Sequence, residues 1–444
     1  MSKEKKREEI KKKVIENEKL AKESGKKEAN GIGTEQKDMK EEGLEKKTYG
    51  LPIGPQHPMY VEAENLMVYV DGETIAKVDI NVGYLHRGIE EIMQRRNYLQ
   101  NIYVSERICG ICSGIHSMTY CQCVENLVGM DIPDRAKYIR MIILELERLH
   151  SHLLFLGVAG YEMGFDTAFM YSWKDREYVM DMLEQISGNR VNYAMPTPGG
   201  VRRDIPNHII PNIMRKLDFL EKRTEYYRKV FLKDRTIIAR TRGLGILPKK
   251  DARNLSMVGP VARASGVRTD VRKEIPYLKY DDVDWKMVVD KGEDTQARIM
   301  VKVLEMFESI EILRQSLKRL ISMPGVGDVR KKFPTMIPEA EAIAVMEAPR
   351  GELVYYAISN GTDKPERMRM RTPSFVNVMY SVPIILKGQQ LADLPVIVAS
   401  IDPCFSCTDR MTLIDTKLGE ARRVDETYLK KLEQKRLKTR GYKR

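Results

Sequence analysis

Two short stretches dictate how this chain must fold: Arg107-Ile-Cys109-Gly-Ile-Cys112-Ser-Gly-Ile-His116 and Asp402-Pro-Cys404-Phe-Ser-Cys407. Each holds a Cys-x-x-Cys pair, and together the pairs use four of the six cysteines. Almost 300 residues separate the pairs, whereas a zinc ribbon places its pairs about 15–20 residues apart. The fold must therefore join the two ends of a large domain into one four-thiolate site, or else it holds two half-sites.

The first pair opens a predicted helix. Cys109 and Cys112 face the same side of a turn, and a helix N-terminus favours the thiolate form that binds metals. His116 follows Cys112 by one helical turn, where it can donate a hydrogen bond to a thiolate or to a metal-bound ligand. Thiolates select nickel, zinc, copper(I) or iron–sulfur clusters, so a structural zinc site and a 4Fe–4S cluster both stay open here. Cys121 and Cys123 fit ordinary buried thiols.

Composition limits the class of protein. The 444 residues are 42% hydrophobic and 31% charged, enough for one large domain or two ordinary ones. The net charge of +12 suits an acidic protein or an anionic membrane face, but the tails do not interleave aromatic and basic residues, which argues against nucleic acid. There is no transmembrane-length apolar run and no signal peptide. We therefore expect a cytoplasmic chain, where Cys-x-x-Cys favours metal binding or redox chemistry over a structural disulfide.

Three segments are expected along the chain. Residues 1–47 are charge-rich with few apolar residues and no aromatic ones, and we predict a disordered tail. Residues 48–410 form the main domain. Residues 411–444 carry 11 Lys or Arg against 5 Asp or Glu, and this basic C-terminal tail is predicted as a strand followed by a helix that begins near Asp425.

Periodicity predicts the elements of the main domain. Asp71-Gly72 between two β-rich runs predicts a hairpin over residues 66–80. Apolar residues at helical spacing predict four long helices, over 135–156 with Asp134 as its cap, 171–186, 207–234 and 296–323. The runs 353–358 and 394–401 are interpreted as strands. The predicted fold class is mainly α with small β pieces, a long helical bundle with short sheets near both ends.

With both cysteine motifs in this order and at this distance, the chain resembles the large subunit of nickel–iron hydrogenases. Four other segments resemble the group 4, energy-converting, membrane-bound hydrogenases and also the 49-kDa subunit of respiratory complex I: Gly54-Pro-Gln-His-Pro58, Gly83-Tyr-Leu-His-Arg-Gly-Ile-Glu90, Ser187-Gly-Asn-Arg190 and Gly199-Gly-Val-Arg-Arg-Asp204. Glu347-Ala-Pro-Arg-Gly-Glu352 resembles hydrogenases broadly. The complex I subunit lacks the four cysteines, so their presence favours a hydrogenase.

The resemblance implies a nickel–iron centre. Cys109 and Cys404 would be terminal ligands of nickel, and Cys112 and Cys407 would bridge nickel to an iron that carries carbon monoxide and cyanide. Arg350 would hang over the metals, where its permanent charge polarises without titrating. The resemblance implies no iron–sulfur cluster within this chain.

Other residues gain expected roles from the same resemblance. Glu62 matches a glutamate placed for proton transfer in energy-converting relatives, and His57 and His86 are candidates for the same proton route. Many hydrogenases have a histidine three residues after the last cysteine, which helps bind a magnesium or iron ion. Here the residue is Arg410, which cannot ligate a cation, and we expect it to pair with Glu90 instead.

The expected function is that of the catalytic large subunit of an energy-converting hydrogenase, which interconverts protons and dihydrogen with electrons from ferredoxin. Expected partners are a small iron–sulfur subunit and ion-translocating membrane subunits, with this chain peripheral on the cytoplasmic side. Hydrogenase precursors are often cut just after this motif, here after Arg410, but the predicted strand and helix favour retention. The alternative is a structural or quinone-site subunit like the 49-kDa protein, with structural zinc on the four cysteines.

Overall fold

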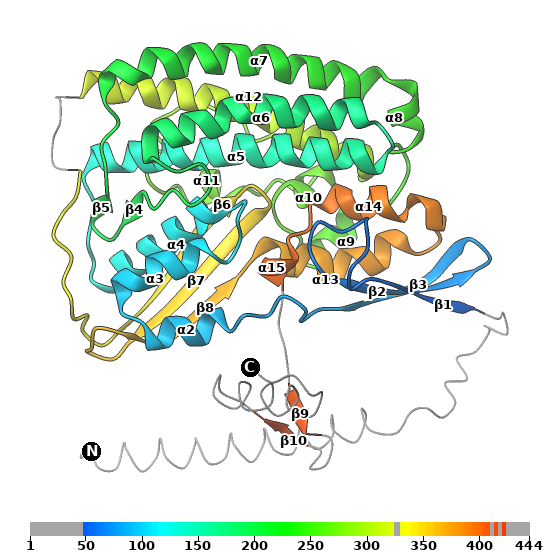
Figure 1. Ribbon diagram of the computed structural model, residues 1–444, viewed down its shortest axis with the longest axis horizontal. Coiled ribbons are helices and arrows are strands. Elements are labelled where there is room, and N and C mark those ends of the chain that lie inside the picture. Colours follow the sequence, from blue (N-terminus) through cyan, green and yellow to red (C-terminus); the bar gives the residue numbers. More distant parts are fainter. Residues whose placement is uncertain (1–47, 324–328, 409–412, 416–419, 423–444) are drawn as a thin grey trace, which may run out of the picture. The chain divides into compact units, whose positions relative to one another are not determined.

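Four long helices lie side by side in the computed structural model, which describes residues 48–323, 329–408, 413–415 and 420–422 (Figure 1). They are α5 (Asp134–Glu162), α6 (Asp166–Ser187), α7 (Ile210–Lys233) and α12 (Thr295–Ser322). Helix α5 packs against α6 and α12, and α12 also packs against α7. The apolar residues that predicted α5 are all buried in the shared core: Ile139, Ile142, Ile143, Leu146 and Leu149. The helical bundle and the mainly helical class with small sheets are confirmed.

Two helix starts differ in detail from the prediction. Pro133, not Asp134, is the N-cap of α5, and its side chain makes no capping hydrogen bond. Asp134 instead lies in the first turn, where a carboxylate is favoured by the helix dipole. A 3-10 turn, η1 (Asn207–Ile209), precedes α7, so that Pro211 falls at the start of the helix. Proline fits there because the first N–H groups of a helix have no intrahelical partner.

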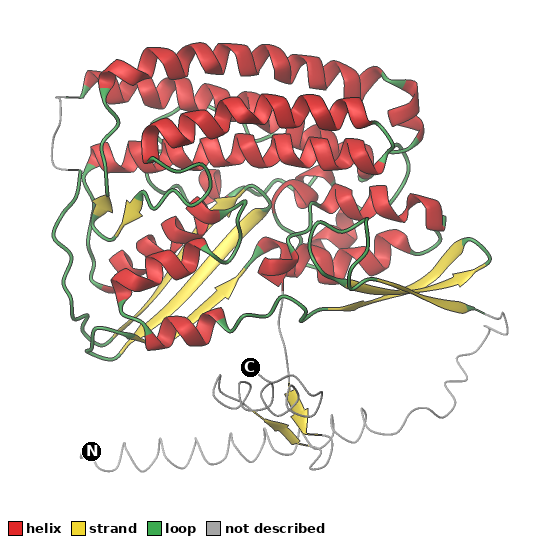
Figure 2. Cartoon of the chain, viewed as in Figure 1, coloured by secondary structure: helices red, strands yellow, loops and turns green. Residues whose placement is uncertain are grey.

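A three-stranded antiparallel sheet lies beside the bundle. It consists of β6 (Ala340–Ala348), β7 (Gly351–Ser359) and β8 (Pro365–Arg371), with β7 in the middle. Helix α4 (Ser113–Leu127) contacts β6 and β7 as well as α5, so it lies between the sheet and the bundle (Figure 2). The tight turn from β6 to β7 contains Pro349 and Arg350, and it therefore presents Arg350 at the end of the sheet.

A second antiparallel sheet holds the predicted hairpin. Its order is β1 (Tyr49–Ile53), β2 (Asn65–Asp71) and β3 (Thr74–Asn81). The turn contains Gly72 with φ +62°, a conformation that glycine adopts without steric cost. The hairpin is confirmed. Helix α13 (Pro373–Leu386) packs against β3.

The run over residues 394–401 was predicted as a strand, and that prediction is wrong. The run forms α14 (Leu394–Ile401), with Pro395 in its first turn. Six of its eight residues are buried, so the sequence shows a continuous apolar run with no periodicity. Such a run, rich in β-branched residues, cannot be assigned from its pattern alone. The proline was the informative residue, because it is well tolerated at a helix start.

Shorter elements complete the main unit, Thr48–Met411. They are α2 (Ile89–Arg95), α3 (Tyr98–Glu106), β4 (Pro196–Thr197), β5 (Gly200–Val201), α8 (Arg235–Ala239), α9 (Lys249–Asn254), α10 (Gly259–Ala264), α11 (Val271–Glu274), η2 (Leu391–Asp393) and α15 (Phe405–Thr408). In the other unit, β9 (Leu413–Asp415) pairs antiparallel with β10 (Glu420–Arg422). The predicted N-terminal tail, Arg410 and the predicted helix after Asp425 lie outside the described residues.

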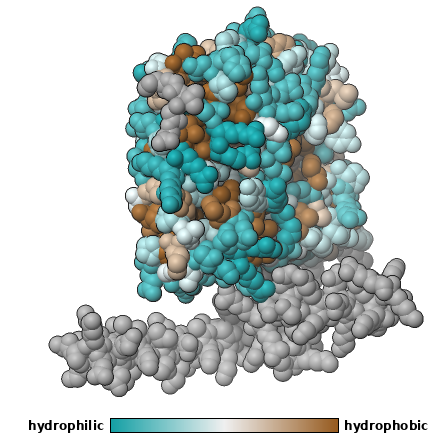
Figure 3. Space-filling view, turned by 60° about the vertical axis from the view of Figure 1, so that its left-hand side comes forward, coloured by the Kyte–Doolittle hydropathy of each residue, from teal (hydrophilic) through white to brown (hydrophobic). Residues whose placement is uncertain are grey.

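No helix among the described residues has the length and apolar character needed to cross a membrane. On the face shown in Figure 3, apolar residues form several separate patches among hydrophilic ones. This pattern is ordinary for a protein surface, since scattered exposed apolar residues need no special explanation.

Candidate metal centre

Three of the four predicted cysteine ligands converge at one buried point. The sulfurs of Cys109, Cys404 and Cys407 all lie within 4.8 Å of one another. Cys404 Sγ is 3.4 Å from Cys109 Sγ and 3.1 Å from Cys407 Sγ, and each residue is at most 5% exposed. The fold therefore closes the chain into one site and does not leave two half-sites.

Cys112 lies beside this group. Its N–H donates to Cys109 Sγ over 3.4 Å, and its own Sγ accepts a hydrogen bond from Arg350 Nη1 over 3.1 Å. A hydrogen bond from a guanidinium is charge-assisted and favours the ionised thiolate. The fourth cysteine thus joins the cluster to a permanent positive charge.

The first cysteine pair is fixed from both sides. Arg87 donates from Nη1 and Nη2 to the carbonyls of Arg107 and Ile108 over 2.7 and 2.6 Å, just before Cys109. On the other side, Glu147 of α5 accepts the N–H groups of Gly114 and Ile115 over 2.5 and 2.9 Å. These are first-turn amides of α4, which have no partner within the helix.

Gly114 makes the contact with Glu147 possible. A Cβ at this position would lie 2.6 Å from Glu147 Oε2 and 3.1 Å from Tyr193 Cδ2, so any larger residue would separate α4 from α5. Burial raises the pKa of Glu147 to about 8, although the hydrogen bonds from Ile115 and Gly114 oppose the shift. Sequence reasoning missed both Arg87 and Glu147, because their partners are set by the tertiary fold.

The second cysteine pair sits where α14 ends. Asp402 ends that helix in the left-handed conformation, with φ +59°, and the turn leads directly into Cys404. Ser374 Oγ accepts the N–H of Cys404 over 3.2 Å, and Thr372 Oγ1 donates to the Cys407 carbonyl over 2.7 Å. Both hydroxyls come from the start of α13, so this helix fixes the C-terminal cysteine loop.

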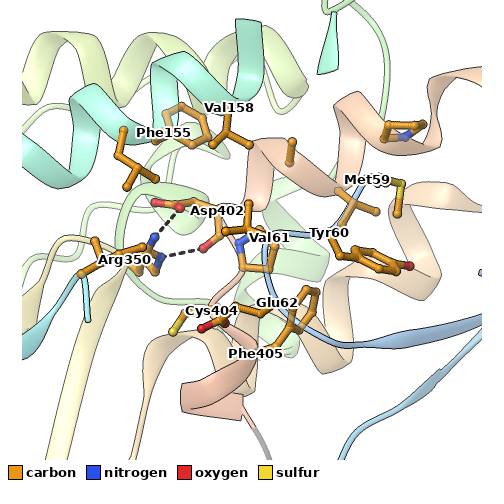
Figure 4. Close-up of a pocket in the computed structure, with 16 residues that line it drawn as sticks. Met59, Tyr60, Val61, Glu62, Phe155, Val158, Arg350, Asp402, Cys404 and Phe405 are labelled. Carbon is orange, nitrogen blue, oxygen red and sulfur yellow. Dashed lines mark hydrogen bonds and ion pairs between the residues drawn. The ribbon is translucent and has the colours of Figure 1, made fainter. Parts of the chain in front are cut away.

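Arg350 bridges the two cysteine segments. Besides its contact with Cys112, it donates from Nη2 to Asp402 Oδ1 over 2.6 Å and from Nε to the Asp402 carbonyl over 2.8 Å (Figure 4). Nη1 also lies 3.4 Å from Ser151 Oγ. Arg350 is only 4% exposed, so its charge acts in a medium that screens it little.

His116 contacts the cluster at Cys407. Its Nε2 is 3.5 Å from Cys407 Sγ, and its Nδ1 is 2.9 Å from the Tyr355 hydroxyl. Burial lowers the pKa of His116 to about 4, so the ring is neutral at pH 7. With Tyr355 donating its O–H to Nδ1, the Nε2–H group faces the sulfur.

Glu62 contacts the loop between the last two cysteines. Its Oε2 accepts the N–H of Ser406 over 2.9 Å, and its Oε1 accepts the Ser406 hydroxyl over 2.5 Å. Figure 4 shows this carboxylate beside Cys404 and Phe405. The structure therefore brings Glu62 to the second cysteine pair, although more than 300 residues separate the two in sequence.

Of the other predicted residues, the two histidines are exposed and Glu90 contacts β8. His57 is exposed and accepts the N–H of Met59 at Nδ1, and His86 is also exposed. Glu90 Oε1 accepts the N–H of Met370 over 3.1 Å, and its Oε2 lies 3.8 Å from Arg367 Nη2. The expected pairing of Glu90 with Arg410 involves a residue outside the described ranges.

An apolar cavity of about 80 Å³ reaches the cluster from one side. Its walls come from α5, α14 and the loop that contains Glu62: Met59, Tyr60, Val61, Leu154, Phe155, Val158, Pro395, Val398 and Ala399. The polar groups that line it are Glu62, Arg350, Asp402 and Cys404. A small apolar molecule that entered here would meet a sulfur, a cation and a carboxylate together.

Buried ion pairs surround the site on its bundle side. Arg263 donates from Nη2 to Glu305 Oε1 over 2.7 Å and from Nη1 to Glu347 Oε1 over 2.8 Å. His152 Nε2 lies 3.0 Å from Glu305 Oε2. Burial opposes the ionisation of Glu305, but Arg263 outweighs it and holds the pKa of this carboxyl well below its usual range. Glu347 opens the motif that contains Arg350, so this network supports the same turn.

The four thiols do not ionise alike. Hydrogen bonds from Cys112, Cys404 and Cys407 lower the pKa of Cys109 well below its usual value. The thiolate of Cys109 in turn helps to raise the pKa of its three neighbours, as does burial, and at Cys112 these two effects outweigh the opposing charge of Arg350. A metal ion bound here would displace the remaining protons, as metal binding to thiols generally does.

The donor set fits a soft metal centre. The sulfur–sulfur distances exceed the length of a disulfide, about 2.05 Å, and are short enough for two sulfurs to share one metal ion, with metal–sulfur bonds of about 2.3 Å. Zinc would be satisfied by four thiolates alone. The cation on Cys112 and the carboxylate over the Cys404 loop are additional groups that a structural zinc site does not need.

Comparison with known proteins agrees with this geometry. The family model of nickel-dependent hydrogenases matches residues 87–157, and that of the 49-kDa subunit of respiratory-chain NADH dehydrogenase matches residues 162–410. The membrane-bound hydrogenase subunit alpha of Pyrococcus furiosus is 43% identical over 381 residues, which cover 82% of this chain and 88% of that protein. The carbon monoxide-induced hydrogenase of Rhodospirillum rubrum is 40% identical over 365 residues, covering 82% and 99%.

A solved structure shows the same fold. A chain of the membrane-bound sulfane sulfur reductase, described as an archaeal respiratory membrane complex, superposes with a TM-score of 0.78 at 32% identity, covering 83% of this chain and 100% of that one. The similar sequences, the shared fold and the clustered cysteines all indicate the same family. The chain belongs to the family that unites the large subunits of group 4, membrane-bound nickel–iron hydrogenases with the 49-kDa subunit of respiratory NADH dehydrogenase.

Proposed function

We propose that this chain is the catalytic large subunit of an energy-converting nickel–iron hydrogenase. The observation that carries the proposal is the meeting of cysteines from both ends of the domain, with Arg350 hydrogen-bonded to Cys112. A structural or quinone-site role with zinc on the cysteines would use the thiol cluster, but it would not require a buried cation beside it.

The cysteines would hold the metals in two roles. Cys109 and Cys404 would bind nickel alone, and Cys112 and Cys407 would bridge nickel and iron. When bound, such a centre supplies electron-rich metals at which dihydrogen is cleaved heterolytically. The iron would carry carbon monoxide and cyanide, for which the positive charge of Arg350 is a suitable neighbour.

The remaining groups prepare the site for this chemistry. The apolar cavity admits dihydrogen, which is small and apolar, and excludes most water. Arg350 lines the cavity with a charge that does not titrate. Glu62 accepts a proton at its carboxylate beside Cys404, and its half-buried position allows transfer toward the surface. His57 lies on the same loop and extends this route outward.

Partners follow from what the chain contains. Cys121 and Cys123 are fully buried, and burial raises the pKa of both thiols, so neither suits a cluster for electron transfer. A small iron–sulfur subunit would therefore deliver the electrons, with ferredoxin as donor. The named relatives include a membrane-bound hydrogenase subunit, which supports a peripheral place on the cytoplasmic face of a complex with membrane subunits.

A second function is favoured by one observation. The longer of the two family matches is to the 49-kDa respiratory subunit, which would make this chain a structural or quinone-site subunit with zinc on its cysteines. The two functions differ in their metals, so metal analysis separates them.

Metal analysis and infrared spectroscopy of the purified complex test the proposal. We expect about one nickel per large subunit, iron in excess of nickel because the iron–sulfur subunit adds its own, and infrared bands of bound carbon monoxide and cyanide. Cys407→Ser should abolish nickel binding, whereas Cys121→Ser, the matched change of a buried thiol outside the cluster, should preserve it. Zinc alone, without those bands, would show that the chain is not a hydrogenase.

A further inference from the structure

Lys302 is a buried lysine on α12, and no step of the proposed reaction uses its charge. It is only 1% exposed, although lysine is rarely buried without a partner. Its Nζ lies 2.5 Å from Asp402 Oδ2 and 3.8 Å from the centroid of the Phe155 ring. Both partners line the cavity that leads to the cysteines.

The carboxylate of Asp402 is shared between two cations. Oδ1 accepts from Arg350 Nη2 over 2.6 Å, and Oδ2 faces Lys302 Nζ over 2.5 Å. The Asp402 carbonyl also accepts from Arg350 Nε over 2.8 Å. Asp402 therefore fixes two edges of the guanidinium, and Lys302 fixes the carboxylate oxygen that Arg350 leaves open.

We propose that Lys302 is a positioning residue that holds the Arg350 guanidinium against Cys112 by anchoring Asp402. The proposal rests on the proposed function, because Arg350 matters for catalysis only if metals occupy the cysteines. Without the ammonium group, Asp402 Oδ2 becomes a buried acceptor without its cation. The carboxylate can then rotate, and Arg350 loses the contact that sets its distance from Cys112.

Lys302 also sets the charge of this wall. Arg350 and Lys302 each carry one positive charge, and Asp402 carries one negative charge, so the three groups together have a net positive charge. Burial lowers the pKa of Lys302 to about 8, while Asp402 opposes the shift, and the side chain is therefore charged at pH 7. The face of Phe155 stabilises the ammonium further, as aromatic rings do for cations.

Arg298 provides a matched control. It lies one turn before Lys302 on α12, is 1% exposed, and donates to Ser400 Oγ over 2.8 Å and to the Gly245 carbonyl over 2.9 Å. It therefore contacts α14 close to Asp402, but none of its hydrogen bonds reaches Asp402 itself. Lys302→Met and Arg298→Met thus each remove one buried cation from the same helix, and only the first acts on Asp402.

The experiment compares Lys302→Met, Lys302→Arg and Arg298→Met in the full complex. We expect Lys302→Met to lose dihydrogen turnover per bound nickel about 10–100-fold, since small displacements of a catalytic group have effects of this size. The infrared band of carbon monoxide should move to lower frequency, because the centre loses a nearby positive charge. Lys302→Arg should restore both, and Arg298→Met should lower only the unfolding midpoint.

Two results would overturn the proposal: wild-type turnover per nickel and an unshifted band in Lys302→Met, or the same band shift in Arg298→Met. If Lys302→Met does not fold, Lys302→Gln takes its place with the same readouts. A wild-type complex without nickel would refute the proposed function alone. The crystal structure of metal-free Lys302→Met then tests the positioning role of Lys302. Displacement of Arg350 from Cys112 would support this role, and an unchanged contact between Arg350 and Cys112 would refute it.

Discussion

Gly259, at the start of α10, meets the backbone directly behind Arg350. A Cβ on Gly259 would lie 2.3 Å from Gly351 Cα and 2.6 Å from the Arg350 carbonyl oxygen, and the φ of Gly259 is +66°. Gly259→Ala must therefore adopt a left-handed conformation and also push two backbones apart. Gly361 is the matched control, because its φ is +82° and a Cβ there would meet no atom within 4 Å.

The two costs can be separated by magnitude. An alanine in the left-handed region costs about 1–2 kcal/mol, which is the whole loss expected for Gly361→Ala. Gly259→Ala adds an overpacking cost of about 1–3 kcal/mol, for an expected loss of about 2–5 kcal/mol. The backbone shift would also move Arg350, so we expect lower turnover per bound nickel in this variant alone.

Urea unfolding of the metal-free chains measures the first effect, and turnover divided by nickel content measures the second. The unfolding slope must stay constant for the midpoints to report stability. Equal losses of stability in both variants would refute the close packing of Gly259 on Gly351. A destabilised Gly259→Ala with normal turnover per nickel would show that this contact does not position Arg350.

Three further changes test the buried charges. Burial lowers the pKa of His152 to about 4 from its usual 6.5, so the unfolded chain takes up this proton at a higher pH than the folded chain. As pH falls from 6.5 to 4, the free energy of unfolding of the wild type should therefore drop by up to about 3 kcal/mol relative to that of His152→Gln, as measured by urea unfolding. A difference that stays constant over this pH range would contradict the lowered pKa. Because the pKa of Glu147 is raised to about 8, wild type should lose stability relative to Glu147→Gln as pH rises from 4.5 to 8, and the opposite slope in the same assay would disprove the raised pKa. Arg263→Met leaves the buried carboxylates of Glu305 and Glu347 without this cation and should cost about 3–5 kcal/mol. Arg190→Met breaks three exposed ion pairs and should cost far less. Similar urea midpoints for the two variants would count against the network.

Sequence predicted the bundle and the closure of the chain for different reasons. The long helices have one apolar face each, so their periodicity is visible without knowledge of their neighbours. The cysteine pairs alone left one joined site or two half-sites open, and the resemblance to nickel–iron hydrogenases then implied a single centre. Glu62 and Arg350 were identified through motifs of the family, and the structure places both at the cluster.

What sequence could not reveal depends on contacts between distant segments. Ser374, Glu147 and Arg87 bind backbone groups, and backbone groups look alike in every sequence. Helix α14 is buried on nearly all sides, so it carries no periodic signal. Lys302 is visible in the sequence, because it interrupts an apolar run in a predicted helix. A charged residue at such a position requires a buried partner.

The separation of the two cysteine pairs also constrains the order of biosynthesis. Cys109 and Cys404 stand 295 positions apart, and the hydroxyls that fix the second loop belong to α13. During translation, a nascent chain has only two of its four proposed ligands until the ribosome has passed Cys404. Since N-terminal segments fold first as the chain emerges, the bundle and the sheet would be complete before a metal could be held. Insertion of the metals would thus be a late event in maturation, which acts on a scaffold that already exists.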